Sequence, residues 1–105
     1  MPRPGSNGGT FQVHCSGLLA ERFKQIQKQA KEEGRGEEVL SATRRVLHQL
    51  SYDPVEFGEP LYRLPALQLS VRHAAIGPVV IHFAVHERMP LVFIKGVTLL
   101  PQKAP

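Results

Sequence analysis

Residues 79–98 decide the fold, and they read Val79-Val-Ile-His-Phe-Ala-Val-His86, then Glu87-Arg-Met-Pro90, then Leu91-Val-Phe-Ile-Lys-Gly-Val-Thr98. The first segment is dense in β-branched residues, which favour strands. The proline-containing middle segment is typical of a turn. We therefore predict two adjacent strands, 79–86 and 91–98, joined by a turn.

A third strand is expected just upstream. Beyond Leu61 the hydrophobic period changes to two: Leu67, Leu69 and Val71 alternate with Gln68, Ser70 and Arg72. Such alternation predicts a strand over residues 67–73. The preceding segment, 52–60, contains Pro54 and Pro60 and is expected to be an irregular connection.

The N-terminal half has the period of helices. Ser16 can cap a helix over residues 17–33, whose apolar stripe is Leu19, Phe23, Ile26 and Ala30. Gly34-Arg35-Gly36 ends that helix, because glycine readily adopts the left-handed conformation of a C-terminal position. A second helix over residues 37–51 begins with Glu37 and Glu38, which suit the helix dipole. The short glycine link predicts a helical hairpin.

One further strand opens the domain. Phe11, Val13 and Cys15 alternate with Gln12 and His14, so residues 11–15 are expected to form a half-buried strand with Cys15 as a small buried apolar group. The order is strand–helix–helix–strand–strand–strand. It predicts an α+β fold, an antiparallel sheet with the helical hairpin packed on one face. Residues 1–9 are expected to be a disordered tail, 10–100 a single domain and 101–105 a frayed C-terminus.

Composition narrows the function classes. The chain has 105 residues, enough for one domain, and 42% are hydrophobic, which argues against wholesale disorder. No stretch approaches the roughly 18 apolar residues of a membrane span, and no signal peptide is recognisable, so neither membrane insertion nor export is expected. With Cys15 as the single cysteine, an internal disulfide is impossible, and a reducing cytoplasm is the expected location. The net charge of +4 suggests nucleic acid, the ribosome or an acidic protein as partner, although a merely soluble basic protein is the alternative.

The register of the strands predicts which residues share a face. If Glu87 lies opposite Pro90, then Val85 faces Val92, Phe83 faces Ile94 and Ile81 faces Gly96 on the helix side. The other face then pairs Ala84 with Phe93 and His82 with Lys95. A three-residue loop at 76–78 would place Val71 opposite Phe83 and Arg72 opposite His82. One bulge would shift this register and reverse the orientation of Arg72.

The sequence resembles the RelE/ParE superfamily of bacterial toxin–antitoxin toxins over about residues 10 to 98. The resemblance lies in the two short helices and in four later segments: Leu61-Tyr-Arg-Leu64, Leu67-Gln-Leu-Ser-Val-Arg72, Pro78-Val-Val-Ile-His-Phe-Ala-Val85 and Leu91-Val-Phe-Ile-Lys-Gly-Val97. It implies a type II toxin with an antitoxin protein as partner. RelE-like members cleave mRNA on the ribosome, whereas ParE-like members poison DNA gyrase.

The resemblance also implies candidate site residues. Arg72, His82 and Lys95 lie near positions where RelE-like ribonucleases carry basic or proton-transfer groups, and we expect them to be catalytic. Arg63 and His86 are expected to contact RNA. In such a reaction the 2′-hydroxyl attacks the neighbouring phosphate, cations offset the charge that builds on it, and an imidazole moves a proton.

Two departures from the family pattern favour a second interpretation. Val79 and Val80 stand where the third strand usually opens with arginine, and Thr98-Leu-Leu100 replaces the His-Arg or His-Tyr that commonly follows the fourth strand. The alternative is therefore a ParE-like gyrase inhibitor or a catalytically silent toxin-fold protein that binds an antitoxin. A helical-hairpin adaptor unrelated to toxins is a third, weaker alternative.

No cofactor or metal site is expected. The sequence contains no glycine-rich phosphate loop and no Ser/His/Asp order. His82 and His86 share a strand face, but four residues separate them by roughly 13 Å. One zinc ion with bonds of about 2 Å cannot bridge that distance.

Overall fold

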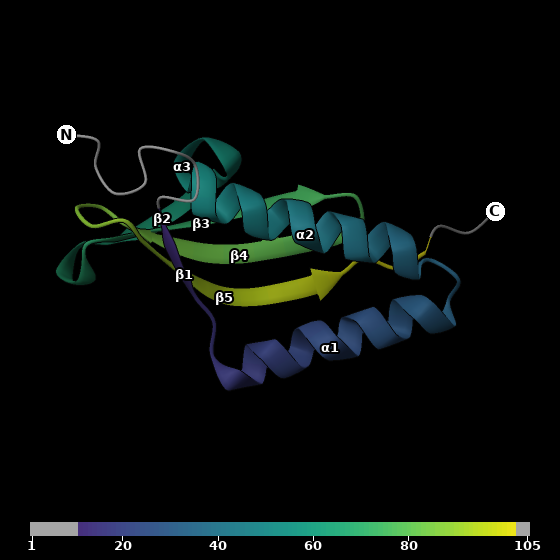
Figure 1. Cartoon of the computed structure of the whole chain (residues 1–105). Coiled ribbons are helices and arrows are strands. Elements are labelled where there is room, and N and C mark those ends of the chain that lie inside the picture. The colour runs from purple at the N-terminus through teal and green to yellow at the C-terminus, as the bar shows by residue number, and fades with distance from the viewer. Residues whose placement is uncertain (1–10, 103–105) are drawn as a thin grey trace.

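The chain folds into a five-stranded mixed sheet with two long helices on one face (Figure 1). The computed structural model describes residues 11–102, so the predicted tail at 1–9 and the last residues of the chain lie outside the described part. The elements in chain order are β1 (Gln12–His14), α1 (Gly17–Glu32), α2 (Gly36–Tyr52), α3 (Pro54–Phe57), β2 (Glu59–Leu64), a 3₁₀ turn η1 (Pro65–Leu67), β3 (Leu69–Ile76), β4 (Val79–His86) and β5 (Leu91–Leu99). The sheet order is β1-β5-β4-β3-β2. The α+β prediction is confirmed.

The helical hairpin forms as its sequence predicts. The Ser16 side chain accepts a hydrogen bond from the Leu19 amide at 3.2 Å and so caps α1. Gly34 has φ +77°, in the left-handed region that glycine enters without a steric penalty, and the chain there reverses into α2. In Figure 1, α2 crosses in front of the sheet and α1, which packs against α2 and β5, runs below β5.

The core lies between these helices and one face of β4 and β5. Ile26 and Ala30 of α1 and Val39, Val46 and Leu50 of α2 are buried there. They meet alternate residues of the central strands: Ile81, Phe83, Val85, Val92, Ile94 and Val97. The expected orientation of residues 81, 83 and 85 toward the helices is therefore confirmed. Among the residues described, no helix is long and apolar enough to cross a membrane.

The predicted all-antiparallel sheet is wrong at one edge. β1 pairs in parallel with β5, with Val13 opposite Val92, and the Gln12 amide donates to the Pro90 carbonyl at 2.8 Å. Alternation along a short strand indicates which side chains are buried, but it carries no information about the direction of the neighbouring strand. Cys15 lies beyond the end of β1 and is exposed, so the expectation that it is buried is also wrong.

The segment 52–60, expected to be irregular, contains the helix α3 and the first residues of β2. Asp53 caps the short helix α3 by accepting from the Glu56 amide at 3.3 Å, and Pro54 occupies the first turn, where its missing N–H costs nothing. β2 follows at once as the edge strand beside β3. Pro60 is tolerated in β2 because edge strands leave one row of amides unpaired.

The register of β4 with β5 is confirmed on one side of a bulge and wrong on the other. Val85 faces Val92, Phe83 faces Ile94 and Ala84 faces Phe93, as expected. The bulge at His82/Phe83 then adds Lys95 as an extra residue, so His82 faces Gly96 and Ile81 faces Val97. The expected pairs His82–Lys95 and Ile81–Gly96 do not form.

The register of β3 with β4 is shifted by one residue from the expectation. Ile76 pairs with Val79, so the turn holds two residues rather than three, and Gly77 has φ +55°. Arg72 therefore lies opposite Phe83, and Val71 lies opposite Ala84. Because directly paired residues point to the same side, Arg72 lies on the helix-covered face, not on the same face as His82.

Candidate functional site

The face of the sheet that no described helix covers, called the open face here, carries a concentration of aromatic and basic side chains. Among the residues that the register places on it are His14, Glu59, Tyr62, Val71, His73, His82, Ala84, His86 and Phe93. Lys95, the extra residue of the β5 bulge, lies on the same face against the ring of Tyr62. Most of the paired residues form two neighbouring rows across the strands. One row runs Tyr62, Val71, Ala84, Phe93, His14; the other runs Glu59, His73, His82, Gly96.

Tyr62 and Lys95 contact each other across the first row. The Lys95 ammonium lies 5.9 Å from the centre of the Tyr62 ring, although β3 and β4 separate their two strands. Val71 and Ala84 lie between them and are only 2% and 1% exposed. The two long side chains therefore lean over a floor of small apolar residues. At the other end of the row His14 stacks on Phe93, with ring centroids 5.2 Å apart.

The second row contains a pair of histidines. His73 and His82 are direct partners in the register, and their rings stack with centroids 5.9 Å apart and planes 19° apart. Both residues are half-buried. The structure thus brings together His82 and Lys95, two of the three predicted catalytic residues, on one face of neighbouring strands.

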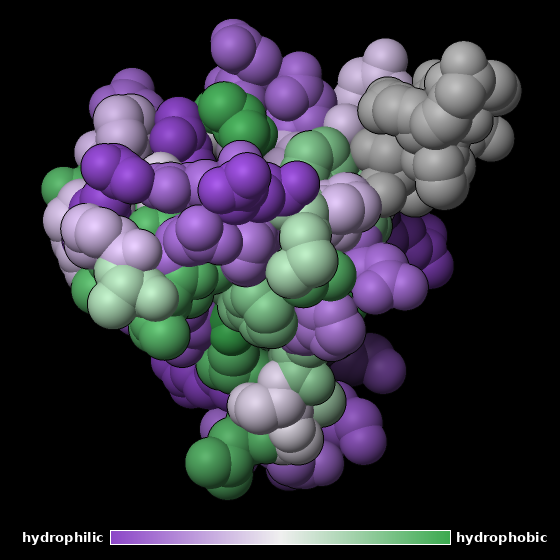
Figure 2. Space-filling model, turned by 90° about the vertical axis from the view of Figure 1, so that its left-hand side faces the viewer, coloured by the Kyte–Doolittle hydropathy of each residue, from purple (hydrophilic) through white to green (hydrophobic). Residues whose placement is uncertain are grey.

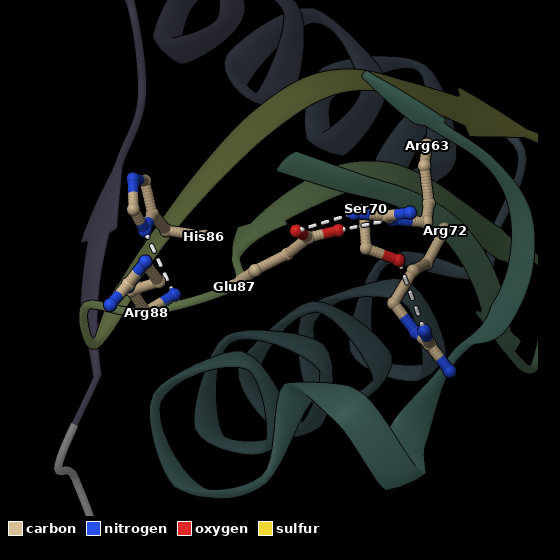
Figure 3. Close-up of polar contacts among 6 residues, drawn as sticks. All are labelled: Arg63, Ser70, Arg72, His86, Glu87 and Arg88. Atoms are coloured by element: carbon tan, nitrogen blue, oxygen red, sulfur yellow. Dashed lines mark hydrogen bonds and ion pairs between the residues drawn. The ribbon is translucent and has the colours of Figure 1, made fainter. Parts of the chain in front are cut away.

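Arg72, the third predicted catalytic residue, is separated from them by the thickness of the sheet. Its guanidinium Nη2 donates to the Val55 and Gly58 carbonyl oxygens at 2.9 and 3.0 Å. Nη1 donates to Ser70 Oγ at 3.2 Å, the contact drawn in Figure 3. These contacts hold the α3–β2 connection against the sheet. Arg72 therefore has a structural function in the fold.

Arg63, predicted to contact RNA, is also on the helix-covered face and is engaged in an ion pair. It lies opposite Ser70, and its guanidinium meets Glu87 in a two-point contact, Nε to Oε2 at 2.5 Å and Nη2 to Oε1 at 2.8 Å (Figure 3). The hydrogen bond from Arg63 lowers the pKa of Glu87 below its ordinary value, and the charges of Arg63 and His86 act in the same direction. The same contact raises the pKa of Arg63.

His86, the second predicted RNA contact, lies at the end of β4 beside the turn. Its Nδ1 accepts hydrogen bonds from the Arg88 amide at 3.1 Å (Figure 3) and from the Met89 amide at 3.0 Å. The imidazole therefore organises the β4–β5 turn. Figure 2, which views the end of the molecule where this turn and η1 lie, shows apolar side chains standing between hydrophilic ones. Met89 and Leu67 are exposed, 49% and 61% respectively.

A second concave region lies on the helix side of β1. It is a groove of about 580 Å³ whose lining is mostly apolar. The residues that line it are Phe11, Val13, Cys15, Ala20, Phe23, Thr43, Leu47, Ser51 and Ile94. Cys15, with no chemistry assigned to it, forms part of this apolar wall. The groove can accept apolar side chains of a bound polypeptide.

Within residues 11–102, no three His, Cys, Asp or Glu side chains are grouped so that they could hold a metal ion. The open face carries imidazole, ammonium, carboxylate and aromatic groups. These can transfer protons, stabilise negative charge and stack against planar ligands.

No protein-family model, no curated protein and no solved structure matches this chain.

Phe93 lies on the open face opposite Ala84, as the predicted β4–β5 register had it. Two other residues of this face, Tyr62 and His73, were not predicted. His73 was missed because the one-residue shift exchanged it with Arg72 as the partner of His82. Tyr62 lay in a segment without an assigned strand, and only the neighbouring Leu61 and Leu64 hinted at one.

Proposed function

We propose that this protein is the toxin of a type II toxin–antitoxin system and a RelE-like endonuclease that cleaves mRNA at the ribosome, with the open face as its RNA-contacting surface. The observation that carries the proposal is the position of His82 and Lys95 on one uncovered face, among the rings of Tyr62, His73 and Phe93. Proteins read single-stranded RNA by stacking bases on aromatic rings and by placing cations at phosphates. The net charge of +4 favours the approach of such a polyanion.

Each side chain has a chemical role in this proposal. Lys95 lies beside Gly96, the register partner of His82, so its ammonium can neutralise a phosphate that the imidazole also reaches. His82 moves a proton to or from the reacting oxygen. Tyr62 and Phe93, in the same row with Val71 and Ala84 between them, offer surfaces on which bases stack.

The test is growth inhibition and mRNA cleavage. The wild-type protein is produced in bacteria from an inducible promoter, and transcripts are mapped for new 5′ ends in cells and in a translation extract. His82→Gln and Lys95→Met should each reduce cleavage by about 10²-fold or more. Lys28→Met, on the exposed side of α1, is the matched control and should leave cleavage unchanged. A folded wild-type protein that cleaves no transcript, with or without ribosomes, would overturn the proposal.

One observation favours a second candidate function. The guanidinium of Arg72 is committed to the Val55 and Gly58 carbonyl oxygens, so the expected set of Arg72, His82 and Lys95 is not assembled. The second candidate is therefore the binding-class alternative: a ParE-like gyrase inhibitor or a catalytically silent toxin-fold protein. Inhibition of DNA supercoiling by gyrase, without cleavage of mRNA, would support the gyrase target.

Both candidate functions include an antitoxin as partner, and we propose the groove beside β1 as its binding site. Phe23 of α1 and Leu47 of α2 line this apolar groove, where an apolar segment of an antitoxin can pack. Co-expression with the product of the adjacent reading frame followed by pull-down tests this. Leu47→Glu should weaken capture, whereas Arg44→Glu, on the exposed side of the same helix, should not. If both variants retain equal amounts of the antitoxin, the antitoxin binds another surface.

A further inference from the structure

His73 and His82 form a stacked pair on the open face. His73 faces His82 directly across β3 and β4, with ring centroids 5.9 Å apart. Cleavage of RNA by its own 2′-hydroxyl requires two proton transfers at two different oxygens. One imidazole can serve only one of them at a time, so a second proton-transfer group beside His82 has a specific use.

The surroundings select His73 rather than the other histidines of the open face. His86 lies four residues along β4 from His82, roughly 13 Å away, and its Nδ1 accepts from two turn amides. His14 stacks on Phe93 in the neighbouring row. His73 alone is both a register partner of His82 and in ring contact with it.

The position beside the pair on β5 is open. Gly96 occupies the position opposite His82 on β5, and a Cβ added at Gly96 would meet nothing within 4 Å. Lys95 directly precedes Gly96 and is the cationic residue closest to it in the sequence. Titratable groups on the neighbouring strands are Glu59 on β2, which is the register partner of His73, Tyr62 on the same strand, and Lys95 on β5.

We propose that His73 is a second proton-transfer residue, paired with His82, in the RNA cleavage reaction; this inference rests on the function proposed above. One imidazole accepts the proton of the 2′-hydroxyl as the 2′-oxygen forms its bond to phosphorus. The other, in its protonated form, donates a proton to the 5′-oxygen as the P–O5′ bond breaks. The products are a 2′,3′-cyclic phosphate and a 5′-hydroxyl, and no metal or other reactant takes part.

The experiment measures the cleavage rate against pH, with ribosomes programmed with a defined mRNA as substrate. Wild type should show a bell-shaped profile, since one group must be unprotonated and the other protonated. His73→Gln should reduce the rate by about 10²-fold or more and remove one limb of the bell, and His82→Gln should remove the other. Replacing the 2′-hydroxyl at the cut position by hydrogen should abolish cleavage.

Control variants distinguish a failure of the His73 inference from a failure of the proposed function. His48→Gln, at an exposed histidine of α2, should leave both limbs in place. His73→Asn is the second variant, and circular dichroism establishes that each variant is folded. If wild type cleaves and both folded His73 variants keep its rate and both limbs, His73 has no catalytic role while the proposed function stands. If wild type cleaves nothing, the proposed function fails and this inference fails with it.

Discussion

Arg72 Nη2 donates to the carbonyl oxygen of Gly58 at 3.0 Å and so joins β3 to the connection between α3 and β2. The same nitrogen also donates to the carbonyl oxygen of Val55, in α3, at 2.9 Å. A planar guanidinium with several donors suits this task, because one side chain satisfies two backbone acceptors and a hydroxyl. Arg72, predicted from the sequence to be catalytic, therefore stabilises the fold.

Arg72→Ala should destabilise the protein. The change leaves the Val55 and Gly58 carbonyl oxygens without their charged donor, and we expect the free energy of unfolding to fall by about 2 kcal/mol. Arg72→Lys should recover only part of this, since an ammonium cannot reproduce the planar fork. Urea unfolding followed by circular dichroism measures the loss, with Arg45→Ala, an exposed arginine of α2, as control. An Arg72→Ala protein as stable as wild type would contradict the structural role.

Gly58→Ala should be strongly unfavourable, because a Cβ there would lie 2.5 Å from Cζ of Phe83 and 3.1 Å from the carbonyl oxygen of His73. The Phe83 ring is fully buried and cannot move without disturbing the core. We expect a loss of about 1–3 kcal/mol in the free energy of unfolding. Gly96→Ala, where the added Cβ meets nothing within 4 Å, should change it by less than about 0.5 kcal/mol. Similar losses in the two variants would refute this packing account.

The Arg63–Glu87 contact should be visible in an acid titration. Because the hydrogen bond from Arg63 lowers the pKa of Glu87 in the folded state, the contact stabilises the fold above the unfolded-state pKa of that carboxyl. This contribution is lost as the pH falls through the lowered folded-state value. Arg63→Met should raise the pKa of Glu87 toward its ordinary range, as measured by NMR of the side-chain carboxyl carbon. An unchanged Glu87 titration in Arg63→Met would show that another group holds the carboxylate.

Leu50 and Leu47 lie on the same helix but should respond differently to truncation. The Leu50 side chain of α2 is fully buried in the core, so Leu50→Ala should lower the free energy of unfolding by about 2–5 kcal/mol. Leu47 is 39% exposed at the groove, and Leu47→Ala should cost less than half as much. Thermal unfolding of the two variants side by side gives the comparison. Equal losses would mean that the groove is closed in solution.

The sequence by itself determined the elements whose signals are local. The apolar stripe and the Ser16 cap of α1, the glycine link at Gly34 and the β-branched run of β4 each specify backbone conformation within a few residues. The burial of Phe83 and Val85 toward the helices followed from alternation combined with one turn. The α+β class could therefore be derived without the structure.

Tertiary structure decided the direction of β1, the register on either side of β4 and hence the composition of the candidate site. Side chains alternate with a period of two, so one residue fewer in the Gly77-Pro78 turn moved Arg72 to the helix-covered face and placed His73 opposite His82. The bulge at His82/Phe83 likewise replaced Lys95 by Gly96 as the partner of His82. Turn length and bulges depend on how the sheet packs as a whole against the helices. Alternation within one strand could therefore predict that His82 lies on the open face, whereas only the packed sheet determined that its partner there is His73.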